Sequence, residues 1–176
     1  MNKMKKWTIG GFLFTSVVGT LLHFAFEKLG TPFWAVIGAV NESTWEHLKL
    51  LFWPFFIFTI IEYFVYGKNI SGFLFSKAIS VIIGMASNVI LFYTYSGVLG
   101  FNVTAIDISL FFIAVILSYF ISYKLNSHTV SYFSAFNSNL AGAVIFLIIA
   151  VLFIIFTFKT PRLGLFLDPV SGKYGI

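Results

Sequence analysis

Residues 139–158 read NLAGAVIFLIIAVLFIIFTF and contain no charged side chain. An apolar run of about 20 residues is long enough to cross the roughly 30 Å hydrocarbon core of a bilayer as one α-helix. Similar runs recur toward the N-terminus, over residues 7–29, 46–66, 73–97 and 104–123. The sequence therefore predicts an all-α integral membrane protein, a single bundle of about five transmembrane helices formed by residues 1–176.

The composition agrees with this class and narrows the chemistry. Of the 176 residues, 59% are hydrophobic and only 10% are charged, which leaves no room for a soluble second domain. The chain has no cysteine, so disulfides, thiolate metal ligands and cysteine nucleophiles are excluded. No basic segment is interleaved with aromatic residues, so nucleic acid is not an expected partner.

The distribution of lysines predicts the orientation in the membrane. With a cytoplasmic N-terminus, six lysines fall on the cytoplasmic side, as the positive-inside rule requires. They are Lys3, Lys5, Lys6, Lys68, Lys77 and Lys124. The same orientation places His128 in a cytoplasmic loop and most acids on the opposite side. Those acids are Glu27, Glu42, Glu46, Asp107 and Asp168.

The first apolar run carries small and polar residues at strict i+4 spacing. They are Gly11, Thr15, Gly19, His23 and Glu27. Residues four apart stack on one helix face, and small ones allow a neighbouring helix to approach closely, so this ridge should face protein. His23 and Glu27 would lie about 6 Å apart along the helix axis. They could share a proton or a metal ion, or form a hydrogen-bonded pair that locks helix packing.

The segment that follows is too short to cross the membrane. Thr31 and Pro32 are typical of a helix start, and residues 33–40 are apolar. We therefore expect a short interfacial or re-entrant piece after the first transmembrane helix.

The most polar stretch of the chain is residues 40–49, VNESTWEHLK. Ionisable groups within or beside membrane spans are expensive to keep and mark candidate functional sites. Ser43 and Glu46 have the spacing of a capping box, in which each side chain accepts a hydrogen bond from the other's backbone amide. This structural interpretation leaves Glu42 and His47 without an explanation.

Two further features could contribute to a site beside this motif. The C-terminal segment 160–176 changes from a plain apolar helix to turn chemistry around Asp168, and we expect it to dock on the side that carries Glu42 and His47. A frayed terminus is the alternative. In the third apolar run, Asn88 lies near mid-membrane and could line a pocket.

Two motifs resemble the signature of a known protein family. Residues 40–49 match Val-Asn-Glu-Ser-x-Trp-Glu-His-Leu-Lys, and residues 168–176 match Asp-Pro-x-(Ser/Thr)-Gly-x-Tyr-Gly-Ile. Both resemble an uncharacterised family of small bacterial polytopic membrane proteins, and the resemblance runs essentially end to end. It implies the fold and a place in the bacterial cytoplasmic membrane, but no reaction.

A weaker resemblance concerns Trp45, His47 and Leu48, which follow a glutamate. They are similar to the first motif of the progestin and adiponectin receptor and alkaline ceramidase superfamily, whose members bind zinc and hydrolyse lipid amides. This chain departs from that pattern, because we predict five spans in place of seven and find no later His-xxx-His pair.

These observations leave three functional hypotheses open. The first is a metal-dependent hydrolase of a lipid or peptide substrate, using zinc or another divalent metal. Its predicted metal ligands are His23, Glu27, His47 and Asp168, with Glu42 as a substitute for Asp168. Its predicted catalytic residues are Glu46, as general base, and Glu42. Its predicted substrate pocket comprises Asn41, Trp45, Lys49 and Asn88.

The second hypothesis is a proton- or cation-coupled transporter or binder of a small molecule, because carboxylate and histidine groups within spans serve proton relays. Homodimerisation could supply the internal repeat that this chain lacks. The third hypothesis is a structural or accessory membrane protein, in which the polar motif is a helix cap and a lock between helices.

Overall fold

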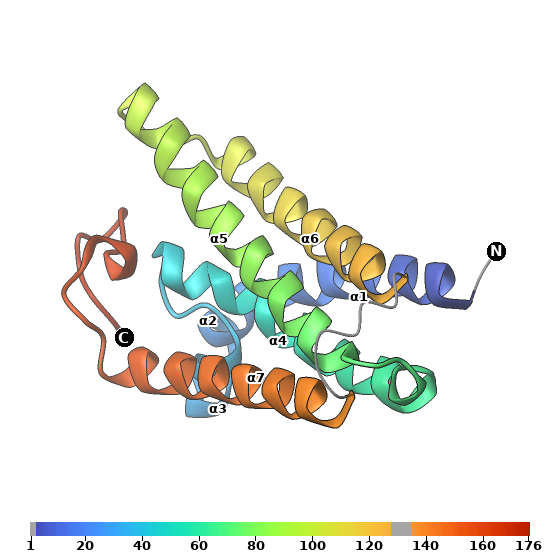
Figure 1. Cartoon of the computed structure of the whole chain (residues 1–176). Helices are drawn as coiled ribbons and strands as arrows, with labels where there is room; N and C mark the ends of the chain where they lie inside the picture. The colour runs from blue at the N-terminus through green and yellow to red at the C-terminus, as the bar shows by residue number, and fades with distance from the viewer. Residues whose placement is uncertain (1–2, 128–134) are drawn as a thin grey trace.

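The computed structural model describes residues 3–127 and 135–176, and these are mostly helical (Figure 1). The longer helices are α1 (Lys3–His23), α4 (Thr44–Val65), α5 (Phe73–Leu99), α6 (Thr104–Ser127) and α7 (Ala135–Phe158). Two short helices, α2 (Ala25–Leu29) and α3 (Pro32–Ile37), lie between α1 and α4, and the single turns η1 (Gly67–Asn69) and η2 (Gly164–Phe166) follow α4 and α7. The predicted all-α class is confirmed for the described residues. His128 lies outside them.

Four of the described helices are long and apolar enough to cross a membrane, namely α4, α5, α6 and residues Asn137–Phe158 of α7. They indicate an integral membrane protein. The first predicted span forms α1, which is not among these four. One face of α1 is apolar and outward, with exposed Ile9, Leu13, Val17 and Leu21 at i+4 spacing. The residues on its other face are small and polar because this face packs against protein. They lower the mean hydropathy of α1.

The helix predicted over residues 7–29 stops at His23. The chain turns at Phe24, forms the short helix α2, and turns again at Gly30, whose φ of 61° is left-handed and favours glycine. Helix α3 then begins with Pro32 in its first turn and contacts both α4 and α7. Because of this break, the residues after His23 do not extend the protein-facing side of α1.

Helices α1 and α4 lie antiparallel and very close together. A Cβ atom on Gly11 would meet the ring of Phe58, and one on Gly19 would meet the backbone oxygen of Leu50 at 2.5 Å. The Thr15 hydroxyl lies 2.9 Å from the Tyr119 hydroxyl of α6. The ridge of small residues therefore serves as the contact that brings the backbones of α1 and α4 together.

A buried ion pair ties α4 to α5 at the end of the bundle near the N-terminus. Glu62 of α4 pairs with Lys77 of α5, and the Tyr66 hydroxyl donates to Glu62 Oε1 at 2.7 Å. The Lys77 ammonium also lies 5.3 Å from the ring centres of Phe55 and Tyr119. Since every partner is satisfied, we interpret this cluster as a structural lock.

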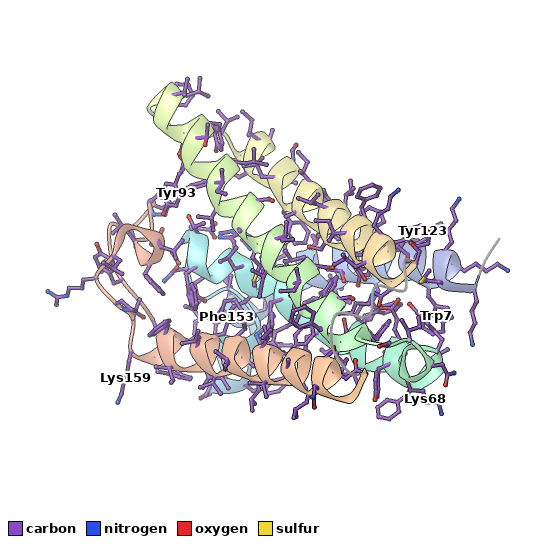
Figure 2. All side chains as sticks on the ribbon, in the orientation of Figure 1. Trp7, Lys68, Tyr93, Tyr123, Phe153 and Lys159 are labelled. Carbon is purple, nitrogen blue, oxygen red and sulfur yellow. The ribbon has the colours of Figure 1, made fainter. Side chains whose placement is uncertain are left out.

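The C-terminal segment lies against the start of α4. Trp45 contacts the ring of Phe166 with a centroid distance of 4.9 Å, and the Asn41 side chain donates to the Gly175 carbonyl at 2.9 Å. The Tyr93 hydroxyl of α5 donates to the Gly164 carbonyl at 3.1 Å. Tail, α4 and α5 therefore meet at the end of the bundle opposite the N-terminus, beside labelled Tyr93 in Figure 2.

Replacing Asn41 with alanine should loosen the tail. The change removes the bond to Gly175 and a second one, in which Asn41 Oδ1 accepts from the Ser43 amide at 2.9 Å. Loss of such bonds costs about 1 kcal/mol each. We expect faster hydrogen–deuterium exchange at tail amides, with exchange in α5 and α6 unchanged as the internal control. Unaltered exchange at the tail would mean that the aromatic contacts alone hold it.

Candidate metal centre

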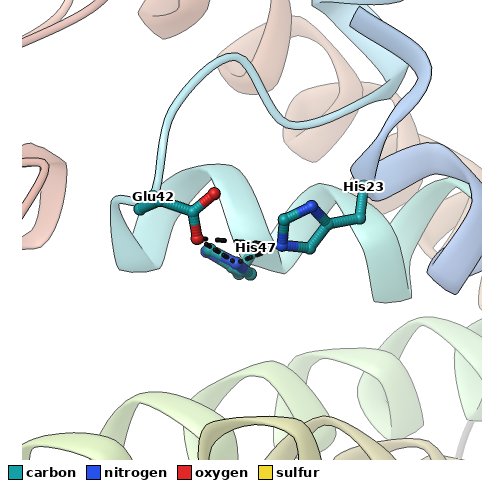
Figure 3. Close-up of side chains that lie close together, drawn as sticks. All are labelled: His23, Glu42 and His47. Atoms are coloured by element: carbon teal, nitrogen blue, oxygen red, sulfur yellow. Dashed lines mark hydrogen bonds and ion pairs between the residues drawn. The ribbon is translucent and has the colours of Figure 1, made fainter. Parts of the chain in front are cut away.

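Three side chains from separate segments meet at the start of α4 (Figure 3). His23 is the last residue of α1, Glu42 lies in the loop before α4, and His47 is in the first turn of α4. One potential ligand atom from each lies within 4.8 Å of the others. The Nε2 atoms of the two histidines are 3.3 Å apart, and Glu42 Oε2 lies 3.4 Å from His47 Nε2 and 3.7 Å from His23 Nε2.

The close packing of α1 on α4 explains why the histidines meet. Gly19 rests on the backbone of Leu50. His23 is one turn further along α1, and His47 is about one turn back along the antiparallel α4, so both lie at the same level. The i+4 ridge of the sequence thus ends in His23, facing the motif of residues 40–49.

Replacing Gly19 with alanine tests this dependence. The new methyl group would overlap the Leu50 carbonyl, so α1 must move away, and overpacking of this kind typically costs about 1–3 kcal/mol. We expect a lower melting temperature and weaker binding of divalent metal by the protein. Gly97→Ala is the matched control, because nothing lies within 4 Å of its added carbon. Unchanged metal binding in the Gly19 variant would contradict this account of the histidine positions.

The orientation of His47 suits a metal ligand. Its Nδ1 atom lies 2.9 Å from the Ser43 carbonyl oxygen, which can only accept, so Nδ1 carries a proton and donates. The lone pair of the neutral ring is then on Nε2, which faces His23 and Glu42. Histidines that bind metals almost always donate their other ring N–H in this way.

The spacing of the three atoms matches a tetrahedral zinc ion. Ligand atoms at roughly 2.0–2.1 Å from zinc with tetrahedral angles lie about 3.3 Å from one another. The three observed separations are 3.3, 3.4 and 3.7 Å. Two imidazoles and one carboxylate are also a known donor set of catalytic zinc, with the fourth position left for water or substrate.

The electrostatics favour an ionised carboxylate at this position. When the His47 ring is protonated on both nitrogens, its hydrogen bond holds the pKa of Glu42 below its usual value, although partial burial acts in the opposite direction. The charges of the two nearby histidines, when protonated, lower this pKa further. Glu42 therefore offers a negative charge to a cation at neutral pH.

A cavity of about 530 Å³ adjoins these three side chains. It lies among α1, α4, α5, α6 and the tail, and His23, Glu42 and His47 all line it. Most of its wall is apolar. That wall includes Leu50, Phe92, Ile108, Leu110, Phe111 and Phe112. The arrangement places three side chains that could hold a metal ion at the wall of a mainly apolar cavity.

Two of the predicted metal ligands lie outside this group. Glu27 is exposed on α2, because the helix break at Phe24 removes it from the ridge on which the prediction depended. Asp168 stabilises a turn of the tail, where its carboxylate accepts from the Val170 amide at 2.8 Å and the Ser171 hydroxyl at 2.6 Å. Glu42, which we predicted as catalytic or as a substitute ligand, is the carboxylate that meets the histidines.

Glu46 is engaged in a buried network and is not free to act as a base. Only half of the predicted capping box forms, with the Glu46 amide donating to Ser43 Oγ at 3.4 Å. The reciprocal half is wrong: the Glu46 carboxylate accepts from the Val40 amide at 3.0 Å and pairs with Lys49. The physical reason is that the fully buried Lys49 ammonium needs a counter-charge.

The predicted pocket residues separate into different roles. Lys49 donates to the Ala35 carbonyl at 2.7 Å and the Thr157 hydroxyl at 3.1 Å, so it joins α3, α4 and α7. Trp45 packs in the aromatic cluster that holds the tail, and Asn41 binds the tail directly. Of the four predicted pocket residues, Asn88 alone lines the cavity.

Sequence reasoning missed several residues around the site. Thr20, Asn102 and Asp107 also line the cavity, as do Pro169 and Val170 of the tail. The Ser43 carbonyl orients His47 and lies four residues before it in the sequence. This contact could have been predicted, because His47 lies in the first turn of a predicted helix. The apolar walls carried no signal, because their residue types are the same as those that face lipid.

The fold and the site define a polytopic helical membrane protein with a His/Glu/His group that could hold a metal ion. The chain belongs to a family of unknown function, DUF6512, whose family model covers residues 1–176. The expected membership of an uncharacterised family is thereby confirmed. Comparison with curated proteins and with solved structures finds no match in either set.

Proposed function

We propose that this protein is a metal-dependent membrane hydrolase that acts on a lipid, with a zinc ion held by His23, Glu42 and His47. The observation that carries the proposal is the spacing of the three ligand atoms, which corresponds to the edges of a zinc tetrahedron. Their position on the wall of a mainly apolar cavity supports a lipid as substrate. The cavity volume of about 530 Å³ is in the range of small-molecule sites.

The chemistry follows from the donor set. Two neutral imidazoles and one carboxylate leave a net positive charge on the zinc ion and one open position. A zinc ion held by these residues would lower the pKa of a bound water toward neutrality and would polarise the carbonyl of an ester or amide. Because Glu46 pairs with Lys49, we assign the nucleophile to metal-bound water and assign no role as base to Glu46.

A second candidate is a binder or transporter of a metal ion or small molecule. One observation favours it: the other carboxylates near the site, Glu46, Asp107 and Asp168, are each held by partners of their own. A site without a free general base is equally suited to binding. The two candidates share the metal group and differ in whether a bond is broken.

We further propose that the protein lies in the bacterial cytoplasmic membrane, with its N-terminus on the cytoplasmic side. In support, labelled Lys68 lies at the end of the bundle where the chain begins, near Trp7, although Lys159 at the other end departs from the positive-inside pattern (Figure 2). The metal group would then face the extracytoplasmic side.

The proposed reaction can be tested with p-nitrophenyl dodecanoate, a chromogenic acyl ester. The protein in lipid nanodiscs is stripped with a chelator and reloaded with zinc. We expect zinc-dependent release of nitrophenol that Glu42→Gln abolishes and Glu27→Gln, the same change at an exposed site, leaves intact. Bound zinc without hydrolysis of ester or amide substrates would favour the binding candidate, and absence of zinc binding would refute both metal proposals.

A further inference from the structure

Asn88 is a buried amide without a protein partner. It lies in the middle of α5, is 8% exposed, and lines the same cavity as His23 and His47. Within the described residues its carboxamide makes no hydrogen bond. In Asn126 of α6, by contrast, the Nδ2 atom donates to the Ser122 carbonyl one turn earlier at 2.8 Å. Asn88 instead directs its polar group toward the cavity.

Packing determines the position of this amide. One turn earlier on α5, a Cβ atom on Gly84 would meet the Ala114 carbonyl of α6 at 2.9 Å. Asn88 and Leu110 are each one turn from this close contact, toward the loop that joins the two helices, and both line the cavity. Asn88 therefore lies on the cavity wall next to the close contact between α5 and α6.

An amide that has no protein partner and faces a mainly apolar cavity needs an explanation. Leaving a buried polar group unsatisfied costs roughly 1–3 kcal/mol by the general experience with protein variants. Native proteins keep few such groups, and those kept commonly meet a ligand or an ordered water. Because the carboxamide is neutral and offers both a donor and an acceptor, it suits a neutral polar group that offers the same pair.

We propose that Asn88 hydrogen-bonds the polar group of a single-chain acyl lipid whose hydrocarbon tail fills the apolar part of the cavity. The inference rests on the proposed function for the reacting end of this lipid, which would lie at His23, Glu42 and His47. It adds the recognition: Asn88 selects lipids with a hydrogen-bond donor beside the carbonyl over analogues that lack one. Charged headgroups are not selected by a neutral carboxamide in an apolar wall.

The test uses two probes that differ in one donor. Dodecanamide and methyl dodecanoate, each with a photoreactive diazirine near the end of the tail, are irradiated with the protein in nanodiscs, and labelling is measured by intact mass. We expect the amide to label the unmodified protein roughly 10-fold more efficiently than Asn88→Leu, since one hydrogen bond is at stake. The ester should label both proteins about equally. Ser87→Ala, at a neighbouring position outside the cavity lining, is the control.

Melting temperatures separate recognition from a structural role. Without probe, Asn88→Leu should melt at or above the temperature of the unmodified protein, because the substitution removes an unsatisfied amide. A clearly lower melting temperature would show that Asn88 supports the fold and would overturn the inference. Equal labelling by both probes in both proteins would also overturn it, and would indicate that an ordered water binds Asn88.

Repeating the labelling after chelation keeps the two proposals distinguishable. If the amide probe labels the protein selectively and this labelling depends on Asn88, but the protein does not hydrolyse the ester, this inference is supported and the proposed reaction is refuted. If Asn88→Leu leaves the zinc-dependent hydrolysis of both probes unchanged, the proposed reaction is supported and this inference is refuted.

Discussion

Zinc bound to the purified protein should disappear when His47 is replaced by alanine. The unmodified protein is expected to hold about one zinc ion per chain, as a site of three protein ligands would. Loss of a group that merely orients a ligand lowers metal affinity roughly 10- to 100-fold, so loss of the ligand itself should lower it further. Elemental analysis of protein purified in detergent and titration of the chelated protein with zinc both measure this effect.

A matched pair of glutamate variants sharpens the test. Glu42→Gln removes the carboxylate that lies 3.4 Å from His47, whereas Glu27→Gln makes the same change at an exposed position on α2. The first should lose zinc and the second should keep it. Zinc should also raise the melting temperature of the unmodified protein but not that of His47→Ala. If His47→Ala lowers the melting temperature and zinc affects neither protein, the three side chains form a hydrogen-bonded lock.

Replacing Lys49 with alanine should cause the largest loss of stability. The change leaves the carboxylate of Glu46, which is 3% exposed, without its counter-charge, and frees the Ala35 carbonyl and the Thr157 hydroxyl. Removing one partner of a buried ion pair costs about 3–5 kcal/mol, which corresponds to a melting temperature lower by on the order of 10 °C. Thermal unfolding in detergent or nanodiscs measures it.

Two further variants provide the control and the rescue for the stability loss of Lys49→Ala. Lys159→Ala removes an exposed lysine at the same end of the bundle and should change the melting temperature little (Figure 2). The double variant Lys49→Met/Glu46→Gln removes both charges and should recover much of the loss. If the double variant were as unstable as Lys49→Ala, the hydrogen bonds to α3 and α7 would outweigh the ion pair.

Much of the fold could be predicted because membrane insertion depends on local properties. Length and apolarity identify a span within one segment, and α4 to α7 follow from them. The small-residue ridge of α1 likewise indicated its protein-facing side, since helical spacing is a local geometry. The break at Phe24 was not visible, because residues 21–29 contain no glycine or proline that would mark the end of a helix.

The candidate site was predictable in part for the same reason. Sequence by itself determined which residues are chemically capable, because ionisable side chains are scarce in this chain and His23, Glu42 and His47 stand out among apolar neighbours. Only the tertiary structure decided which of them meet, because α1 and α4 approach at Gly19 and because the helix break turns Glu27 away. Burial likewise decided that Lys49 claims Glu46, since an ammonium without water requires a nearby carboxylate.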